Sequence, residues 1–388
     1  MNAIDLVPAS FMAETEMAIF QRSLAGFLDA HASPAAIDRW RAGKQVDKAV
    51  WRAAGEAGLL GVSMPEEYGG GGGDFRHEAA IVQAIGHRGA DALTLCLHNA
   101  VILPYFASYG TPEQRAHWLP RFCSGEMVTA IAMTEPAAGS DLQGMRTRAR
   151  RDGNGYRLTG QKTFISNGQI ADMVLVAAKT DPDAGSKGIS LFIVDVSQAP
   201  EGFARGRNLD KVGQEGQDTS ELFFDDLFVP ADALLGDVEG RGMAQLMAKL
   251  PQERVVIAWQ AMAMIELALG ETIAYVRQRE MFGQSLAAFQ NTQFKLAEYK
   301  TQATIAKVFL NHCTEKLLAG ELDTATASMA KYWISDQLSE IVDGCLQFFG
   351  GYGYMNEYPI GRLYRDSRIH RIYGGANEIM KLLIARTL

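Results

Sequence analysis

The sequence predicts an α+β multidomain protein, in which a helical N-terminal domain, a middle antiparallel β-barrel or sandwich domain and a C-terminal four-helix bundle follow one another. Three observations support this class. The chain has 388 residues, more than one hydrophobic core usually holds, and 47% of them are hydrophobic. Apolar residues recur at helical spacing in the first and last thirds of the chain. The middle third carries short β-type runs separated by turn residues.

The N-terminal domain is expected to span residues 1–127. Its apolar residues step by three and four, and the helical patterns cover residues 11–28, 51–60, 78–86, 93–109 and 112–122. A glycine run at 69–73 has neither the GK[ST] ending nor the GxGxxG spacing of a phosphate-binding loop. We therefore interpret this run as a flexible connection between helices.

The middle β domain is expected at residues 128–240. Its predicted strands lie at residues 156–159, 162–165, 173–178, 189–196 and 220–224, with turns between them. Just before the first of these, Arg146, Arg148 and Arg150 alternate as residues on one face of a strand do. A solvated outer face is favoured over a binding surface for these arginines.

The C-terminal bundle is expected at residues 241–388, with helices at 243–279, 290–318, 324–349 and 377–386. Pro251 suits a first helical turn, which would place Glu253 and Arg254 near a helix N-terminus. Glu253 then has two interpretations: a carboxylate that interacts well with the helix dipole, or a catalytic base. Because Gln260 and Glu266 interrupt the longest apolar run, no membrane span is predicted.

Composition and missing motifs exclude several classes of protein. The formal net charge of −8 argues against broad attraction to nucleic acid or anionic lipid. The four cysteines lack CxxC spacing and are interpreted as reduced core thiols, and the acidic N-terminus resembles no signal or transit peptide, so a cytoplasmic location is expected. No HExxH pair, GxSxG elbow or dinucleotide fingerprint occurs, which disfavours metal sites, hydrolases and nicotinamide enzymes.

Four polar segments with glycines remain: MTEPAAGSD at 133–141, KTFISNG at 162–168, QFFGGYGY at 347–354 and RIYGGANEI at 371–379. Each alone has an ordinary explanation as a turn or a helix cap. In this order, with QREMFG and FQNTQF between them, they resemble the acyl-CoA dehydrogenase family over essentially the whole chain. The segments PQERVVIA, ATASMAKYW, YMNEYPI and YGGANEIM are most similar to its long-chain branch.

The resemblance implies bound FAD. Backbone and hydroxyl groups would bind the flavin ring and pyrophosphate from Met133, Thr134, Gly139 and Ser140, and Phe164 and Ser166 would flank the isoalloxazine. A neighbouring subunit completes the site in this family, usually within a homotetramer, although a dimer also fits. The residues that would reach the adenosine-diphosphate half of a partner's FAD are Arg279, Phe282, Gln290, Gln347 and Gly351.

The position of the catalytic base departs from the commonest family pattern. Most members carry a Glu directly after the Tyr of the final motif, whereas Tyr373 is followed here by Gly374. In the long-chain and isovaleryl branches the base lies on the bundle helix, and the matching residue is Glu253. Burial beside an acyl channel would raise its pKa, while a helix terminus and Arg254 would lower it, and the sequence does not decide between them.

The remaining expectations concern the substrate and the flavin. The backbone N–H of Gly374 and a ribityl hydroxyl of the flavin would polarise the thioester carbonyl, with Tyr373 at the substrate and Arg254 at its CoA moiety. Ala376 stands where a Thr is common, which removes one hydroxyl contact to FAD that Glu378 can partly replace. The residues expected to shape the acyl pocket are Leu93, Leu97, Phe106 and Met262.

The function predicted from these residues is FAD-dependent α,β-dehydrogenation of a long-chain or branched acyl-CoA. The product would be trans-2-enoyl-CoA, and the electrons would pass to an electron-transfer flavoprotein. Three alternatives stay open: an oxidase of the same fold that uses O2, a desaturase of acyl-carrier substrates, and a noncatalytic flavoprotein relative. If the noncatalytic relative is taken to be a nucleic-acid-associated protein, the acidic composition argues against it.

Overall fold

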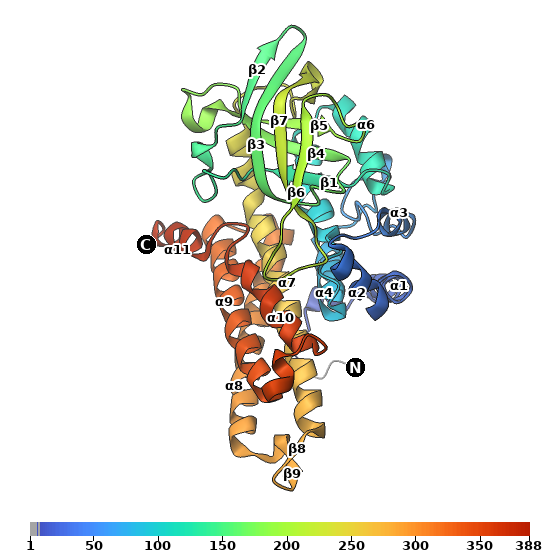
Figure 1. Ribbon diagram of the computed structural model, residues 1–388, viewed down its shortest axis with the longest axis vertical. Coiled ribbons are helices and arrows are strands. Elements are labelled where there is room, and N and C mark those ends of the chain that lie inside the picture. The colour runs from blue at the N-terminus through green and yellow to red at the C-terminus, as the bar shows by residue number, and fades with distance from the viewer. Residues whose placement is uncertain (1–5, 7) are drawn as a thin grey trace.

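The computed structural model describes residue 6 and residues 8–388. Residues 1–5 and 7, part of the N-terminus that argued against a signal peptide, lie outside the described residues. Figure 1 shows a β-sheet at one end of the long axis, a helical bundle at the other, and the N-terminal helices packed along one side. The predicted helical, β, helical order is confirmed.

The N-terminal part is helical, as predicted. Its helices are α1 (Thr15–His31), α2 (Pro34–Gly43), α3 (Lys48–Glu56), α4 (Phe75–Arg88), α5 (Leu103–Tyr109) and α6 (Pro112–Cys123), with a π-helical segment at Leu97–Ile102 before α5. Polar side chains cap several of them: Ser33 accepts from the backbone of α2, and Asp74 and Thr111 begin α4 and α6 with capping boxes. Local capping therefore fixes where these helices begin.

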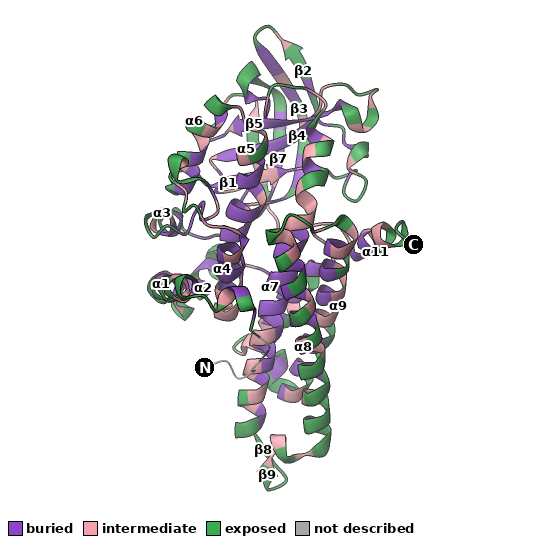
Figure 2. Ribbon diagram, turned by 180° about the vertical axis from the view of Figure 1, so that it is seen from behind, coloured by how far each residue is buried: buried purple, intermediate pink, exposed green. Residues whose placement is uncertain are grey.

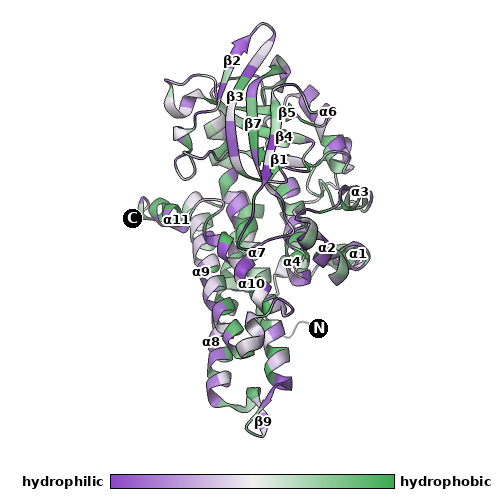
Figure 3. Ribbon diagram, in the orientation of Figure 1, coloured by the Kyte–Doolittle hydropathy of each residue, from purple (hydrophilic) through white to green (hydrophobic). Residues whose placement is uncertain are grey.

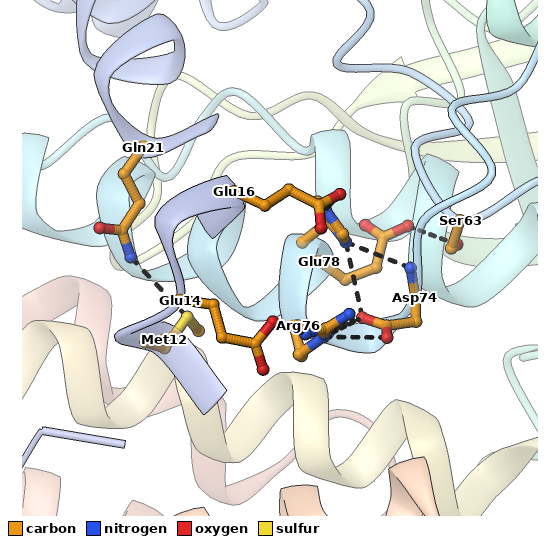
Figure 4. A network of polar contacts seen from close by, with 9 residues as sticks. Met12, Glu14, Glu16, Gln21, Ser63, Asp74, Arg76 and Glu78 are labelled. Atoms are coloured by element: carbon orange, nitrogen blue, oxygen red, sulfur yellow. Dashed lines mark hydrogen bonds and ion pairs between the residues drawn. The ribbon is translucent and has the colours of Figure 1, made fainter. Parts of the chain in front are cut away.

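The glycine run before α4 is not the flexible connection that the sequence predicted. Backbone N–H groups of Gly71, Gly72 and Gly73 donate to carbonyls of Gly61, Met64 and Val62, so the segment is folded back on itself. A Cβ at Gly70 would overlap the Met64 backbone. Glycine is required here because two backbone segments approach closely. Figure 4 shows the polar contacts nearby, where Arg76 bonds Asp74 and Glu14.

The middle part is one mixed sheet with the strand order β1-β4-β2-β3-β7-β6, and β5 pairs with β4. Its strands are β1 (Thr129–Ala132), β2 (Arg148–Asp152), β3 (Gly155–Ser166), β4 (Met173–Lys179), β5 (Ile189–Asp195), β6 (Phe203–Asn208) and β7 (Thr219–Pro230). Most pairs are antiparallel as predicted, but β4 runs parallel to both β1 and β2. The intervening β2–β3 hairpin brings the chain back to the end of the sheet where β1 began, which allows those pairings.

The two strand patterns expected at 156–159 and 162–165 form a single strand, β3, whose register with β7 shifts at Gly160. The alternating arginines behave as predicted, because Arg146, Arg148 and Arg150 are all exposed. The segments β1, β2 and β6 were not among the predicted strands.

The C-terminal part is the predicted helical bundle. Its helices are α7 (Gly242–Gln278), α8 (Gln290–Leu318), α9 (Thr324–Phe349), α10 (Pro359–Ser367) and α11 (Asn377–Ala385), with a short hairpin of β8 (Glu280–Met281) and β9 (Gln284–Ser285) between α7 and α8. The helix α7 packs against α4, α8, α9 and α10. Figure 2 shows buried residues concentrated along it, and Figure 3 shows that these residues are largely apolar.

One expectation about α7 is corrected. Pro251 lies inside the helix, nine residues after its start at Gly242, so Glu253 is not near a helix N-terminus. By length and composition α7 is also long and apolar enough to cross a membrane, although the sequence pattern predicted no such helix. Of its most apolar window, 67% is buried inside the protein, as expected for the core helix of a bundle. The four cysteines are free and buried.

Candidate active site

Glu253 lies on the buried face of α7 and faces a tyrosine from the N-terminal part. Its side chain is 6% exposed, and the Tyr105 hydroxyl on α5 donates to its Oε1 at 2.8 Å. Tyr105 is itself fully buried. The two residues are 148 positions apart in the chain. The structure therefore places a carboxyl group inside the protein with a single neutral hydrogen-bond partner.

Burial decides the protonation of this carboxyl group. Loss of hydration raises the pKa of Glu253 to about 7, although the bond from Tyr105 and the positive charges of Arg254 and Lys249 act in the opposite direction. The helix dipole has no part in this balance, because Glu253 lies well inside α7. A carboxyl group with a pKa near neutrality can accept and release a proton at working pH.

Gly374 meets the same face of α7, one turn further along. It has φ +63, and a Cβ built on it would overlap the Cδ1 of Ile257. Ile257 follows Glu253 by four residues and so shares its helix face. The turn that lacks the common Glu thus lies next to the helix that supplies Glu253. A Glu restored at position 374 would need Ile257 to move.

Tyr373 contacts α7 about one turn beyond Ile257. Its hydroxyl donates to Gln260 Oε1 at 3.0 Å, and Gln260 Nε2 contacts Cys96 Sγ at 3.2 Å. A small enclosed cavity borders this group, and its lining includes Leu93, Cys96, Gln260 and Met264. Of the residues expected to shape an acyl pocket, Leu93 lines this cavity. The other three belong to the hydrophobic cores: Met262 in the bundle, and Leu97 and Phe106 beside the sheet.

Arg254 follows Glu253 on α7 and faces α9. Arg254 is 3% exposed, its Nη1 donates to Ser328 Oγ on α9 at 3.2 Å, and its Nε is buried without a hydrogen-bond partner in the protein. Lys331 of α9 is fully buried and donates to the Gly375 carbonyl at 2.7 Å. The predicted contact of Arg254 with CoA is not tested by this geometry and stays a prediction.

The first group of predicted flavin residues gathers at the edge of the sheet. The loop after β1 is tied to β3, because Thr163 N–H donates to the Thr134 carbonyl at 2.9 Å and Lys162 donates to the Met133 carbonyl at 3.0 Å. Lys162 also pairs with buried Glu135 at 2.8 Å. Gly139 and Ser140 of this loop are exposed.

Within this group, Phe164 has an unusual backbone conformation and an unusually exposed side chain. It has φ +60 in the left-handed region, and 66% of its surface is exposed although it is a large apolar side chain. A strained backbone that presents an aromatic ring to the outside fits a planar ring system packed on it. Ser166, two residues on, is half-buried on the same strand. The loop and Phe164 together therefore fit the isoalloxazine part of a flavin.

The second group of predicted cofactor residues lies at the far end of α7. Arg279, Gln347 and Gly351 line one pocket of about 570 Å³, together with Asn291 and Thr292. Gln290 begins α8 and does not line that pocket, and Phe282 is 90% exposed on the β8–β9 hairpin. The cationic and amide groups of this pocket suit a diphosphate and its nucleoside.

The two groups of predicted cofactor residues lie far apart in this chain. Glu253 and Arg279 are 26 residues apart along α7 and its end, which corresponds to about 39 Å at 1.5 Å per residue. In Figure 1 the hairpin of β8 and β9 lies at the opposite end of the molecule from the sheet. Ala376 caps α11, and Glu378 is exposed in the first turn of that helix.

Sequence reasoning missed the residues that support the site from a distance. Tyr105, Lys162, Glu135 and Lys331 carry no pattern that distinguishes them from other residues of their segments, and each acts through a partner from another element. The only available signal was a charge inside an apolar helical pattern, as for Lys331 in ATASMAKYW.

Comparison with known proteins gives a consistent result over the whole chain. Three family models match: "Acyl-CoA dehydrogenase, N-terminal domain" at residues 14–126, "Acyl-CoA dehydrogenase, middle domain" at 130–227 and "Acyl-CoA dehydrogenase, C-terminal domain" at 240–388. The mitochondrial long-chain specific acyl-CoA dehydrogenase of Sus scrofa is 44% identical over 376 residues, which are 96% of this chain and 86% of that protein.

Two further proteins are similar to this chain over most of its length. The mitochondrial isovaleryl-CoA dehydrogenase of Solanum tuberosum is 36% identical over 372 residues, 95% of this chain and 89% of that one. The crystal structure of acyl-CoA dehydrogenase from Geobacillus kaustophilus is 43% identical with a TM-score of 0.95, and the match covers 98% of this chain and 99% of that one.

Proposed function

Because the chain belongs to the acyl-CoA dehydrogenase family, whose members are oxidoreductases, we propose that it uses FAD to oxidise a long-chain or branched acyl-CoA to the trans-2-enoyl-CoA. The observation that carries this proposal is the juxtaposition of Glu253 and Gly374. A carboxyl group with a pKa of about 7 lies on the helix face against which the Gly374 turn packs. This pair supplies a base and a carbonyl-binding amide side by side.

Glu253 takes the proton from Cα. A thioester α-proton is only weakly acidic, so the base must be close in pKa to the working pH and the developing charge on the carbonyl oxygen must be stabilised. The backbone N–H of Gly374 would bind that oxygen, and such a donor can contribute roughly 3 to 4 kcal/mol to the transition state. Tyr105 holds the Glu253 carboxylate in place through its hydrogen bond.

The flavin fits the residues at the sheet edge. The loop of Met133, Thr134, Gly139 and Ser140 and the exposed Phe164 ring would hold its isoalloxazine. When bound there, the flavin would accept the hydride from Cβ and offer a ribityl hydroxyl to the carbonyl. Its adenosine-diphosphate half would lie in the Arg279 pocket of a neighbouring subunit, because the distance along α7 places this chain's own pocket out of reach. We therefore propose a homo-oligomer, with an electron-transfer flavoprotein as the acceptor.

An anaerobic titration of the purified flavoprotein tests the proposed reaction. Straight-chain and branched acyl-CoA thioesters of increasing length are added, and loss of the oxidised flavin absorbance is recorded. We expect bleaching by long-chain or branched thioesters, with the 2-enoyl-CoA identified by mass spectrometry. Bleaching by no acyl thioester contradicts the proposal. Stoichiometric peroxide in air without an electron-transfer partner would indicate an oxidase, and preference for an acyl-carrier protein over CoA would indicate a desaturase.

A further inference from the structure

A buried lysine of the bundle contacts the Gly374–Gly375 turn, and a buried arginine lies near that lysine. Lys331 on α9 is 0% exposed, and its Nζ donates to the Gly375 carbonyl at 2.7 Å and to Asn377 Oδ1 at 2.9 Å. Arg254 on α7 is 3% exposed and donates to Ser328 Oγ. Lys331 and Arg254 are close enough that the charge of Arg254 helps to lower the pKa of Lys331.

Neither cation has a carboxylate within ion-pair distance among the described residues, although the charge of the neighbouring Glu253 acts on Arg254 from further away. Their hydrogen-bond partners are a carbonyl, an amide and a hydroxyl, all neutral. The interior of a protein normally pairs a buried charge, because an unpaired one is costly to desolvate. Two unpaired cations side by side therefore need an explanation that a stable fold alone does not provide.

The other ionisable groups around Lys331 do not cancel this charge. Asp336 on α9 is engaged by Arg371 at 2.6 Å and Lys381 at 3.9 Å, and Glu378 on α11 is exposed. Burial lowers the pKa of His370 to about 4, so it is neutral at working pH. Burial, followed by the charge of Arg254, lowers the pKa of Lys331 to about 8, which leaves it mostly protonated at neutral pH. The space beneath the turn is therefore electropositive.

The Gly374 amide is close to this charge. The Lys331 ammonium lies 2.7 Å from the Gly375 carbonyl oxygen. The path from that oxygen to the Gly374 nitrogen consists of one Cα–Cα step of about 3.80 Å and three short backbone bonds. The ammonium and the amide nitrogen are therefore at most about 11 Å apart. At that separation inside a protein, one unit charge changes the free energy of another by roughly the equivalent of one pK unit.

We propose that Lys331, with Arg254, stabilises the negative charge that develops on the thioester carbonyl oxygen during proton removal by Glu253. The Cα–H electron pair moves toward the carbonyl as the proton passes to the Glu253 carboxylate. With a flavin bound as proposed, the pair would then form the C=C bond as the Cβ hydride passed to that flavin. Lys331 touches neither substrate nor flavin in this account. It is a positioning residue that holds the Gly375 carbonyl and supplies charge beneath the amide, and this inference rests on the proposed function.

The step that Lys331 is expected to assist can be measured without oxidation. A long-chain acyl-CoA whose Cβ is replaced by sulfur retains its α-protons but cannot lose a hydride. Bound to the flavin-loaded enzyme in D2O, it exchanges α-protons for deuterium only when the base removes them. Mass spectrometry gives the exchange rate, and equilibrium dialysis gives the affinity of the thioester. Flavin absorbance confirms that each variant is loaded.

Lys331→Gln and Lys331→Arg separate charge from hydrogen bonding, because Gln keeps a donor for Gly375 without the charge. We expect exchange about tenfold slower in Lys331→Gln, with thioester affinity within about twofold of the wild type, and near-normal exchange in Lys331→Arg. Normal exchange in Lys331→Gln would overturn the inference, as would equal slowing in both variants. Failure of the proposed function looks different, since the wild type would then exchange no faster than Glu253→Gln.

Discussion

The hydrogen bond from Tyr105 lowers the pH at which Glu253 becomes a base, against the larger effect of burial. It stabilises the carboxylate and so partly offsets the burial that raises the pKa of Glu253 to about 7. Tyr105→Phe removes the donor, and we expect the acid limb of flavin reduction to move upward by about 0.5–1 pH unit. Stopped-flow reduction across pH measures this, with Tyr109→Phe as the control. A midpoint that stays or falls in Tyr105→Phe would show that Glu253 does not titrate in this limb.

The same carboxyl group links folding stability to pH. The pKa of Glu253 is raised from 4.5 in the unfolded chain to about 7 in the fold, so the folded state binds the proton more tightly. Its unfavourable contribution is absent below 4.5, grows as pH rises to 7, and is then constant. Glu253→Gln should therefore match the wild type in acid and exceed it above neutrality by up to about 3 kcal/mol. Urea unfolding at two pH values checks this, and an advantage that does not grow with pH would contradict it.

At the scale of elements, the Gly374 turn packs closely against α7. Gly374→Ala adds a Cβ that overlaps Ile257 Cδ1 at φ +63, and we expect a loss of about 1–3 kcal/mol. Ile257→Val removes Cδ1, so the cost of Gly374→Ala should fall by at least about 0.5 kcal/mol in that background. A double-mutant cycle on thermal unfolding measures this coupling. Strict additivity would mean that the turn and the helix do not meet as described.

The glycine run before α4 offers a second element-scale prediction. Gly70→Ala brings a Cβ onto the Met64 backbone, which cannot rotate away, so we expect a loss of about 1–3 kcal/mol. The matched control is Gly26→Ala in α1, where nothing lies within 4 Å of the added Cβ and the helix should gain about 0.5–1 kcal/mol. Equal tolerance of both changes in urea unfolding would restore the interpretation of a flexible connection.

The sequence predicted an element correctly where the residues that determine it lie within that element. Helices α8 and α9 were predicted with their observed bounds, because their apolar periodicity and turn residues are contained within them. The periodicity predicted α7 at 243–279, within one residue of its observed bounds. The separate interpretation of Pro251 as a first-turn residue was wrong, because tertiary packing keeps this proline inside the helix. The parallel β1–β4 pair and the Tyr105–Glu253 bond depend on residues brought from distant parts of the chain, which no local pattern contains.

At the scale of the molecule, the separation of the two cofactor groups predicts that flavin retention depends on association. Arg279→Gln removes the cation of the far pocket, and we expect the fraction of protein that retains FAD to fall at least about tenfold on dilution. Arg277→Gln, an exposed arginine on the last turn of α7, serves as the control. The ratio of flavin to protein absorbance after gel filtration measures retention. A monomer that keeps FAD in spite of Arg279→Gln would refute a site shared between subunits.

The whole account depends on Glu253 as the base, and one measurement addresses that directly. Glu253→Gln keeps the shape and the Tyr105 bond but cannot accept a proton. Before substrate is added, the variant should show the oxidised flavin spectrum. Under anaerobic conditions, a long-chain acyl-CoA that bleaches the wild-type flavin should reduce the flavin of the variant at least about 10³-fold more slowly. Bleaching of Glu253→Gln at the rate of the wild type would contradict the assignment and move the base elsewhere.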